Sequence, residues 1–179
     1  MLDGIHKIHL IGIGGSGMRA IANILIQKGY DVSGSDVADS AVIEKFRNMG
    51  ATVHIGHNKD YVKGVDVVVR STAIREDNPE IVAAKEQGIT ILHRSDIVKA
   101  VLDVTDGIAV AGAHGKTSTT SMIGQILVEA EADPTVIIGG EVDYLKGSSC
   151  LGKGHFSVVE ADESDGSFLR SEERRVGKE

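Results

Sequence analysis

Short apolar runs rich in β-branched residues alternate along this chain with segments in which apolar residues recur every three or four positions. The runs predict strands at residues 7–11, 32–36, 52–55, 65–69, 90–92, 108–111, 136–138 and 156–159. The segments between them predict helices at residues 18–28, 40–49, 79–87, 95–101 and 117–130, the fourth of them capped by Ser95. Such alternation is typical of parallel βαβ units. The pattern therefore predicts an α/β fold, with five strands before a hinge at residues 103–106 and at least three after it.

Composition narrows the class of protein. Apolar residues make up 41% of the chain, enough for a buried core, and the 22 glycines among 179 residues exceed the usual share of about 7%. A net charge of −7, with three Phe, three Tyr and no Trp, argues against a nucleic-acid partner. We find neither an apolar run of about 20 residues nor a signal-peptide pattern, and Cys150 is the one cysteine. We therefore expect a cytoplasmic protein with no membrane partner.

A glycine-rich loop follows the first predicted strand and precedes the first helix. It has the spacing G-x-G-x-x-G, which lets backbone N–H groups approach a diphosphate at a helix N-terminus. Asp36 ends the next strand, where a carboxylate can bind ribose hydroxyls. A tight turn that binds nothing is the alternative interpretation. The pattern predicts a Rossmann-like nucleotide site with these candidate substrate-binding residues: Gly12, Gly14, Gly15, Ser16, Gly17 and Asp36.

A second loop follows the sixth predicted strand and contains the Gly-Lys-Thr core of a P-loop. In that motif the lysine neutralises β- and γ-phosphate charge and the threonine hydroxyl binds Mg²⁺. Valine stands at position 110, where the full P-loop pattern has its outer glycine, so a chance match is the alternative. The candidate ATP-binding residues are Gly112, Ala113, His114, Gly115, Lys116, Thr117 and Ser118.

Polar residues also follow other predicted strands. Glu160 comes directly after the last strand and is the candidate second ligand, with Thr117, for Mg²⁺; a solvated acidic turn formed with Asp162, Glu163 and Asp165 is the alternative. Three small residues after the fourth strand, and a basic one after the fifth, are further substrate-binding candidates: Ser71, Thr72, Ala73 and Arg94. Arg94 could equally form a surface ion pair. The His6/His9 and His54/His57 pairs have H-x-x-H spacing without a second pair of ligands, so we expect no zinc site.

Together these segments resemble the Mur ligase family of peptidoglycan synthesis. The likeness covers residues 3–169 and rests on three segments in order, residues 8–18, 111–120 and 160–168, with residues 71–74 and Asn78-Pro79-Glu80 in support. The resemblance implies a Rossmann-like parallel-sheet domain for a UDP-sugar at residues 1–104. It also implies the truncated start of a P-loop ATPase-type α/β domain at residues 105–169. The charged tail at 170–179 does not resemble the family and is interpreted as an artefact.

The resemblance also implies an activity. An ATP-dependent ligase would join L-alanine to UDP-N-acetylmuramic acid through an acyl phosphate, with Lys116, Thr117 and Glu160 as catalytic residues and the amino-acid site in sequence beyond this chain. The chain alone would be inactive. A sibling enzyme that attaches a recycled peptide is less well matched by the glycine-rich opening. Two further alternatives stay open: an NAD(P)-dependent oxidoreductase, which leaves Gly115-Lys116-Thr117 unexplained, and a non-catalytic nucleotide-binding module.

Overall fold

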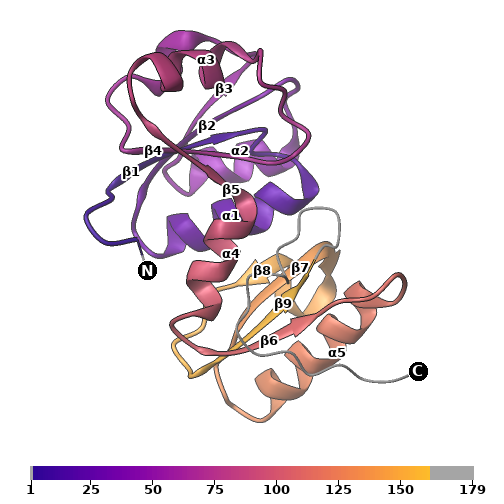
Figure 1. Cartoon of the computed structure of the whole chain (residues 1–179). Coiled ribbons are helices and arrows are strands. Elements are labelled where there is room, and N and C mark those ends of the chain that lie inside the picture. The colour runs from indigo at the N-terminus through magenta and orange to yellow at the C-terminus, as the bar shows by residue number, and fades with distance from the viewer. Residues whose placement is uncertain (1, 162–179) are drawn as a thin grey trace.

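The computed structural model describes residues 2–161, which form two sheets that lie one above the other (Figure 1). The first sheet has five parallel strands in the order β3-β2-β1-β4-β5. Its strands are β1 (Lys7–Ile11), β2 (Asp31–Asp36), β3 (Thr52–Ile55), β4 (Val67–Arg70) and β5 (Thr90–His93). The strand order reverses between β1 and β4. In such sheets ligands bind in the crevice beyond the carboxyl ends of the strands at that reversal.

Helices cover both faces of the first sheet. Buried apolar side chains of α1 (Ser16–Gln27), α2 (Ala41–Asn48) and α4 (Arg94–Leu102) pack on one face. On the other face lie α3 (Pro79–Glu86) and the 3-10 helix η1 (Lys59–Val62). Coverage of both faces explains why the residues of β4 from Val67 to Val69 are all apolar and all buried. None of the helices within residues 2–161 has the length and apolar character needed to cross a bilayer.

Helix starts follow local capping chemistry. The Ser40 hydroxyl accepts the Ile43 N–H at 3.3 Å at the start of α2, and the Asn78 side chain accepts the Glu80 N–H at 2.9 Å at the start of α3. The prediction that Ser95 caps the fourth helix was wrong. His93 is the cap: its Nδ1 accepts the Ser95 N–H, and its own N–H donates to the Asp96 carboxylate at 2.8 Å. This is a capping box in which an imidazole replaces the usual hydroxyl.

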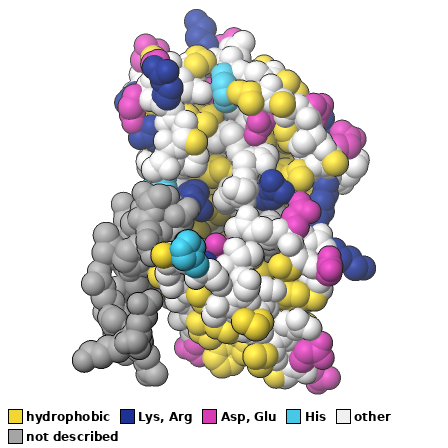
Figure 2. Space-filling model, turned by 90° about the vertical axis from the view of Figure 1, so that its right-hand side faces the viewer, with side chains coloured by type: hydrophobic (Ala, Val, Ile, Leu, Met, Phe, Trp, Pro, Cys, Tyr) yellow, Lys and Arg dark blue, Asp and Glu magenta, His cyan; other side chains and the backbone are white. Residues whose placement is uncertain are grey.

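The second sheet is smaller and mixed, in the order β6-β9-β7-β8. It consists of β6 (Asp106–Val110), β7 (Thr135–Val142), β8 (Gly147–Cys150) and β9 (Phe156–Glu160), with the short 3-10 helix η2 (Asp143–Leu145) between β7 and β8. The strand β8 was not predicted from the sequence, and it pairs with β7 in the antiparallel direction. The helix α5 (Lys116–Glu129) lies against β7 and β9. Met122 and Ile126 on α5 are 57% and 66% exposed, and Figure 2 shows hydrophobic side chains gathered over the lower part of the molecule.

The helix α1 joins the two sheets, since it also packs against β7 and β8. The Asn23 side chain donates to the Ser149 carbonyl at 3.1 Å, and the Ser149 hydroxyl donates to the Ala20 carbonyl at 3.1 Å. Ile137 and Val159 of the second sheet belong to the same apolar cluster as the buried face of α1. The N-terminus of α1, which follows the first glycine loop, therefore lies beside the second sheet.

Candidate functional site

The first glycine loop turns tightly at the carboxyl end of β1. The N–H groups of Gly12 and Ile13 both donate to the Ser35 carbonyl, at 2.8 and 3.1 Å, so the loop is anchored on β2. A Cβ at Gly14 would lie 3.0 Å from an Asp36 oxygen, and a Cβ at Gly17 would lie 2.6 Å from an Arg94 nitrogen. Charged side chains approach the backbone closely at these two positions, so a side chain in place of either glycine would displace the Asp36 carboxylate or the Arg94 guanidinium.

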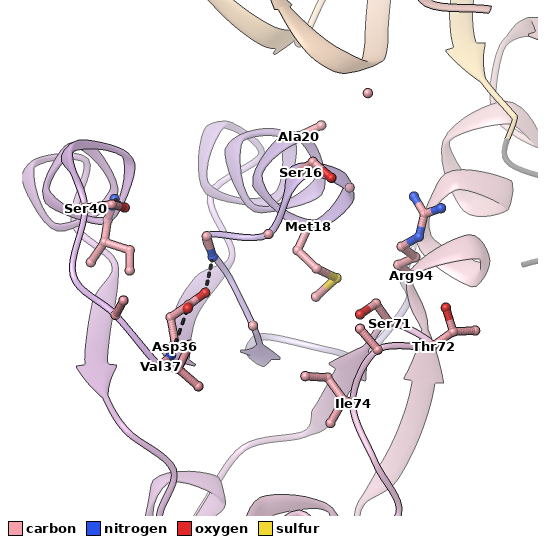
Figure 3. Close-up of a pocket in the computed structure, with 18 of the residues that line it drawn as sticks. Ser16, Met18, Ala20, Asp36, Val37, Ser40, Ser71, Thr72, Ile74 and Arg94 are labelled. Atoms are coloured by element: carbon pink, nitrogen blue, oxygen red, sulfur yellow. Dashed lines mark hydrogen bonds between the residues drawn. The ribbon is translucent and has the colours of Figure 1, made fainter. Parts of the chain in front are cut away.

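Asp36 has a structural task in this loop. One of its carboxylate oxygens accepts the Gly14 N–H and the other accepts the Val37 N–H, both at 2.8 Å (Figure 3). The sequence prediction gave Asp36 a role in binding ribose hydroxyls. Asp36 does line the cavity at this end of the sheet, and its bonds to the backbone also hold the glycine loop in shape.

This cavity of about 590 Å³ lies over the carboxyl ends of the first sheet. Asp36, Val37 and Ser40 lie on one side of it, and Ser71, Thr72, Ile74 and Arg94 lie on the other, with Ser16 and Met18 between them (Figure 3). All ten residues expected to bind substrate from this half of the chain line this one cavity: Gly12, Gly14, Gly15, Ser16, Gly17, Asp36, Ser71, Thr72, Ala73 and Arg94. Sequence spacing predicted the set, and the parallel sheet brings it together.

Part of the cavity wall comes from the second sheet. Ile137, Ile138 and Gly139 of β7 line it, and so does Glu160 at the end of β9. That these residues share a cavity with the first glycine loop was not predicted from the sequence. Nothing in the local pattern of β7 signals it, because the contact depends on how α1 packs against the second sheet.

The second glycine loop lies at the carboxyl end of β6 and leads into α5. Gly115 is the N-cap, with φ of 76°, a left-handed conformation that favours glycine. His114, Gly115 and Ser118 are exposed, so the backbone of this turn is open to solvent. The Lys116 ammonium folds back and donates to the Gly112 carbonyl at 2.8 Å. An open turn at a helix N-terminus with a lysine beside it can bind a phosphate chain.

Glu160 connects this second loop to the cavity. The Thr117 hydroxyl lies 3.1 and 3.2 Å from the two Glu160 carboxylate oxygens, and the Gly139 N–H donates to one of them at 2.8 Å. The two candidate metal ligands therefore lie together, although 43 residues separate them in the chain. A hydroxyl and a carboxylate are oxygen donors of the kind that Mg²⁺ prefers, so the pair fits that ion.

Residues 2–161 contain no cluster of three or more histidine, cysteine or acidic side chains that could hold a metal ion. A magnesium ion bound by two protein ligands completes its shell with phosphate oxygens and water. The other acids of the predicted turn, Asp162, Glu163 and Asp165, and the tail at 170–179 lie outside the described residues.

A buried polar cluster lies beneath one end of the cavity, and it was not predicted from the sequence. Glu80 on α3 is completely buried, and its carboxylate accepts hydrogen bonds from His9, Ser35 and His57 at 2.8, 2.7 and 2.9 Å. The second histidine of each H-x-x-H pair therefore binds a carboxylate. The other histidine of the second pair, His54, stacks on Tyr61 with 3.9 Å between ring centroids. The sequence feature that could have indicated this cluster is His9, a polar residue among the apolar residues of β1.

The hydrogen bonds keep Glu80 ionised. Burial alone raises the pKa of a carboxyl group. Here the hydrogen bonds from His9 and Ser35, the charge of His9 and the hydrogen bond from His57 outweigh that effect and hold the pKa of Glu80 below its ordinary value of 4.5. Glu80 is therefore an ionised carboxylate in direct contact with His57, which lines the cavity.

Comparison with known proteins places this architecture in a family. Residues 7–104 match the family described as "Mur ligase family, catalytic domain". A UDP-N-acetylmuramate–L-alanine ligase of Sulfurihydrogenibium is 49% identical over 166 residues, or 93% of this chain. The crystal structure of a UDP-N-acetylmuramate–alanine ligase from Thermotoga maritima superposes with a TM-score of 0.80 at 36% identity, over 88% of this chain and 37% of that one.

A sibling activity has a similar fold. The UDP-N-acetylmuramate:L-alanyl-γ-D-glutamyl-meso-diaminopimelate ligase of Neisseria superposes with a TM-score of 0.82 at 28% identity, over 89% of this chain and 53% of that one. The chain spans 37% of the length of the Sulfurihydrogenibium relative. The likeness therefore concerns the first sheet, with its glycine loop, and the part of the second sheet that this chain contains.

Proposed function

The chain belongs to the Mur ligase family, and from that premise we propose that it serves an ATP-dependent ligase that joins L-alanine to UDP-N-acetylmuramic acid. The names of the relatives at 47–50% identity support the alanine-adding reaction over the peptide-recycling one, whose solved examples are 28–29% identical. The activity is proposed for a protein of the relatives' full length, since this chain spans 37% of it.

One observation carries the proposal. Glu160 lines the same cavity as the first glycine loop, and its carboxylate accepts a hydrogen bond from the Thr117 hydroxyl of the second loop. A ligase of this type needs such a meeting point, because the sugar carboxylate must reach the terminal phosphate of ATP. Two anion sites on separate faces of the molecule could not support the reaction.

The two loops divide the substrates between them. The residues of the first loop, with Ser71, Thr72, Ala73 and Arg94, bind the UDP-sugar, and we assign residues 1–104 to this task. Residues 105–169 begin the ATP-binding domain. Its loop, Gly112 to Ser118, holds the triphosphate at the N-terminus of α5. ATP chemistry of this kind is cytoplasmic, and no nucleic acid or membrane takes part.

The chemistry follows from the weakness of a carboxylate as an acyl donor. A lactyl carboxylate oxygen attacks the γ-phosphorus, the bond to the bridging oxygen breaks, and ADP leaves. The amine of L-alanine then attacks the carbon of the acyl phosphate and loses a proton, and phosphate leaves as the amide forms. Lys116 neutralises charge on the transferring group, while Thr117 and Glu160 hold Mg²⁺. When bound, that ion neutralises further charge on the phosphates.

Equilibrium titration tests the proposal. UDP-N-acetylmuramic acid and Mg-ATP are each titrated into the protein by calorimetry, with NADH as the competing ligand for a G-x-G-x-x-G loop. We expect saturable binding of the first two and none of NADH. Saturable NADH binding without a response to the UDP-sugar would support the oxidoreductase alternative. Binding of both nucleotides by a full-length protein that forms no amide would support the non-catalytic alternative.

A further inference from the structure

A second cavity, of about 240 Å³, lies between the helices of the first sheet and the antiparallel pair β7–β8 of the second. One wall comes from α1 and α2, and the other from Glu141 and residues 146–149. At this place α1 packs against β8 (Figure 1). We call this cavity the α1–β8 groove. None of the residues assigned above to the UDP-sugar or to ATP lines it, so it is separate from the proposed active site.

The α1–β8 groove carries positive charge in a chain whose net charge is −7. Its charged lining residues are three cations and one acid: Arg19, Lys45, Lys146 and Glu141. The Lys45 ammonium on α2 lies 3.8 Å from the place that a Cβ would occupy at Gly147, so it reaches across to β8. Neither lysine forms an ion pair with any residue in the described part of the chain. Two such ammonium groups on facing walls of one cavity favour an anion between them.

Arg19 is incompletely hydrogen-bonded. Its Nη1 donates to the Glu141 carboxylate at 2.9 Å, whereas its Nε is buried and has no partner among the described residues. A buried N–H without an acceptor has lost its hydration and gained nothing in return. The Glu141 side chain is 64% exposed, so its ion pair with Arg19 is weak. The guanidinium can therefore turn its Nε–Nη2 edge, which fits two oxygens of one oxyanion, toward the groove.

The backbone at Lys146 is strained. Its φ is 51°, in the left-handed region that non-glycine residues seldom adopt. Glycine or asparagine would adopt this conformation more easily. The position that ends η2 nevertheless has a lysine, and this lysine lines the groove. Residues held in such conformations cluster at ligand sites.

A phosphate group fits these features better than a carboxylate does. The three cations come from three separate elements, α1, α2 and the end of η2. A tetrahedral dianion offers two oxygens to the guanidinium edge and the others to the two ammonium groups. A carboxylate offers two oxygens and one charge. The volume of the groove accommodates a phosphate group with some of its hydration water.

We propose that the α1–β8 groove is a phosphate-binding site, distinct from both glycine loops. Arg19, Lys45 and Lys146 hold the anion, and Glu141 competes with it for the guanidinium. The ligand is inorganic phosphate or the phosphate group of a phosphomonoester, since the groove is open to solvent. Because its two walls belong to different sheets, a bound phosphate also stabilises the packing of one sheet against the other.

The Nε–H resonance of Arg19 tests the site directly. Phosphate also binds at glycine loops, so a bulk affinity would mix several sites, whereas this resonance belongs to the groove. Inorganic phosphate is titrated into the ¹⁵N-labelled chain at neutral pH and constant ionic strength. We expect saturable shifts of the Arg19 Nε–H and of the Gly147 amide, with a Kd of about 1 mM. Succinate, a dicarboxylate, should bind far more weakly.

A titration with glycerol 2-phosphate distinguishes the two sources of the phosphate group. Tighter binding than that of inorganic phosphate supports the site with an esterified ligand. Weaker binding supports it with the free anion. In either case the same two resonances should shift.

Substitutions of the two lysines test the charge that the site requires. Lys45→Gln and Lys146→Asn should each weaken phosphate binding at the groove by about five- to tenfold, through loss of one charge-assisted hydrogen bond. Asparagine at 146 tolerates the left-handed backbone, so this variant removes the charge without adding strain. Lys28→Gln is the matched control, because Lys28 is exposed at the end of α1 and lies outside the groove. It should change the affinity less than twofold.

Glu141→Gln separates a binding site from a purely structural ion pair. Loss of the competing carboxylate should tighten phosphate binding severalfold, and a variant that only loosens the fold cannot gain affinity. Asp143→Asn removes the same charge two residues away, outside the groove, and should have a smaller effect. Arg19→Lys keeps the charge but lacks the planar fork, so it should weaken binding by about tenfold.

Three results would overturn the inference. They are an Arg19 resonance that does not respond to phosphate at about 20 times the expected Kd, succinate binding as tight as phosphate binding, and Lys45→Gln with wild-type affinity. The groove would then be a water-filled crevice with a structural Arg19–Glu141 pair. The measurements use neither the UDP-sugar nor ATP, so their outcome is independent of the proposed function.

Discussion

The two sheets of this chain differ in how completely they are covered. In the first, helices pack on both faces, and the central residues Ile8, Leu10 and Ile11 are fully buried. In the second, α5 packs against β7 and β9 and α1 packs against β7 and β8, but β6 has one neighbouring strand among the described residues, and Phe156 and Ile126 are 38% and 66% exposed. The comparison teaches that the first sheet has its own core on both faces, whereas the part of the second sheet in this chain shares its core with α1 and leaves part of α5 exposed.

Each half also contains a carboxylate that accepts several hydrogen bonds, and these two differ in the same way. Glu80 is fully buried, whereas Glu160 is half-buried and lines the cavity. Glu80→Ala should lower the free energy of unfolding by about 3–5 kcal/mol, because it leaves buried donors and two imidazoles without their acceptor. Glu160→Ala should cost only about 1 kcal/mol. Urea denaturation measures both, and equal costs would contradict the contrast.

The second half of the chain, which contains the Gly-Lys-Thr loop, should matter most for turnover. Lys116→Ala in the full-length protein should reduce ligation by about 10²–10³-fold, as expected for loss of one group that stabilises charge in the transition state. UDP-N-acetylmuramic acid should still bind with near-normal affinity, since its loop lies on the other sheet. Lys153→Ala, in an exposed turn, is the control. Unchanged ligation in Lys116→Ala would refute the assignment of this lysine.

Two isoleucines on helices test the difference in coverage directly. Ile24 on α1 is fully buried, whereas Ile126 on α5 is 66% exposed. Ile24→Ala should cost about 2–5 kcal/mol of unfolding free energy, and Ile126→Ala should stay within about 0.5 kcal/mol. Chemical denaturation of this chain gives both values. A large cost at Ile126 would mean that α5 is covered in solution.

Acid sensitivity should distinguish the buried charge from surface ones. Because the pKa of Glu80 is lowered in the folded state, its contribution to stability is present above the ordinary value of 4.5 and is lost as the pH falls through the folded-state value. Thermal unfolding from about pH 7 to pH 3 should therefore show a weaker acid decline in Glu80→Gln than in wild type. Asp60→Asn, at an exposed pair with Lys63, should change the decline little. An identical decline in Glu80→Gln and wild type would mean that this carboxyl is not ionised in the native state.

Local patterns predicted most of the first half. Apolar runs identified its five strands, Asn78-Pro79 the start of α3, and Gly29 the end of α1, where φ is 86°. The strand β8 was missed because its residues, Gly147 to Cys150, are small and polar, and antiparallel pairing with β7 provides their place. The predicted cap of α4 was wrong because the His93 imidazole, and not the Ser95 hydroxyl, caps this helix.

The parts of the candidate site that follow a strand directly in sequence could be predicted. The contacts between residues that are distant in sequence could not. Both glycine loops and Glu160 come directly after strands, so spacing alone identified them. The His57–Glu80 contact joins residues 23 apart, and Gly139 reaches the first cavity only through packing of α1 on the second sheet. Such contacts depend on which elements pack together, which periodicity does not encode.

A crystal structure of the full-length protein with UDP-N-acetylmuramic acid, Mg²⁺ and a non-hydrolysable ATP analogue tests the central claim most directly. The decisive quantity is the distance from the lactyl carboxylate oxygen to the γ-phosphorus. We predict about 3–3.5 Å, beside Glu160, with the diphosphate on residues 12–17 and the triphosphate on residues 112–118. A sugar nucleotide bound elsewhere, or two ligands whose reacting atoms lie far apart across the cavity, would contradict the account.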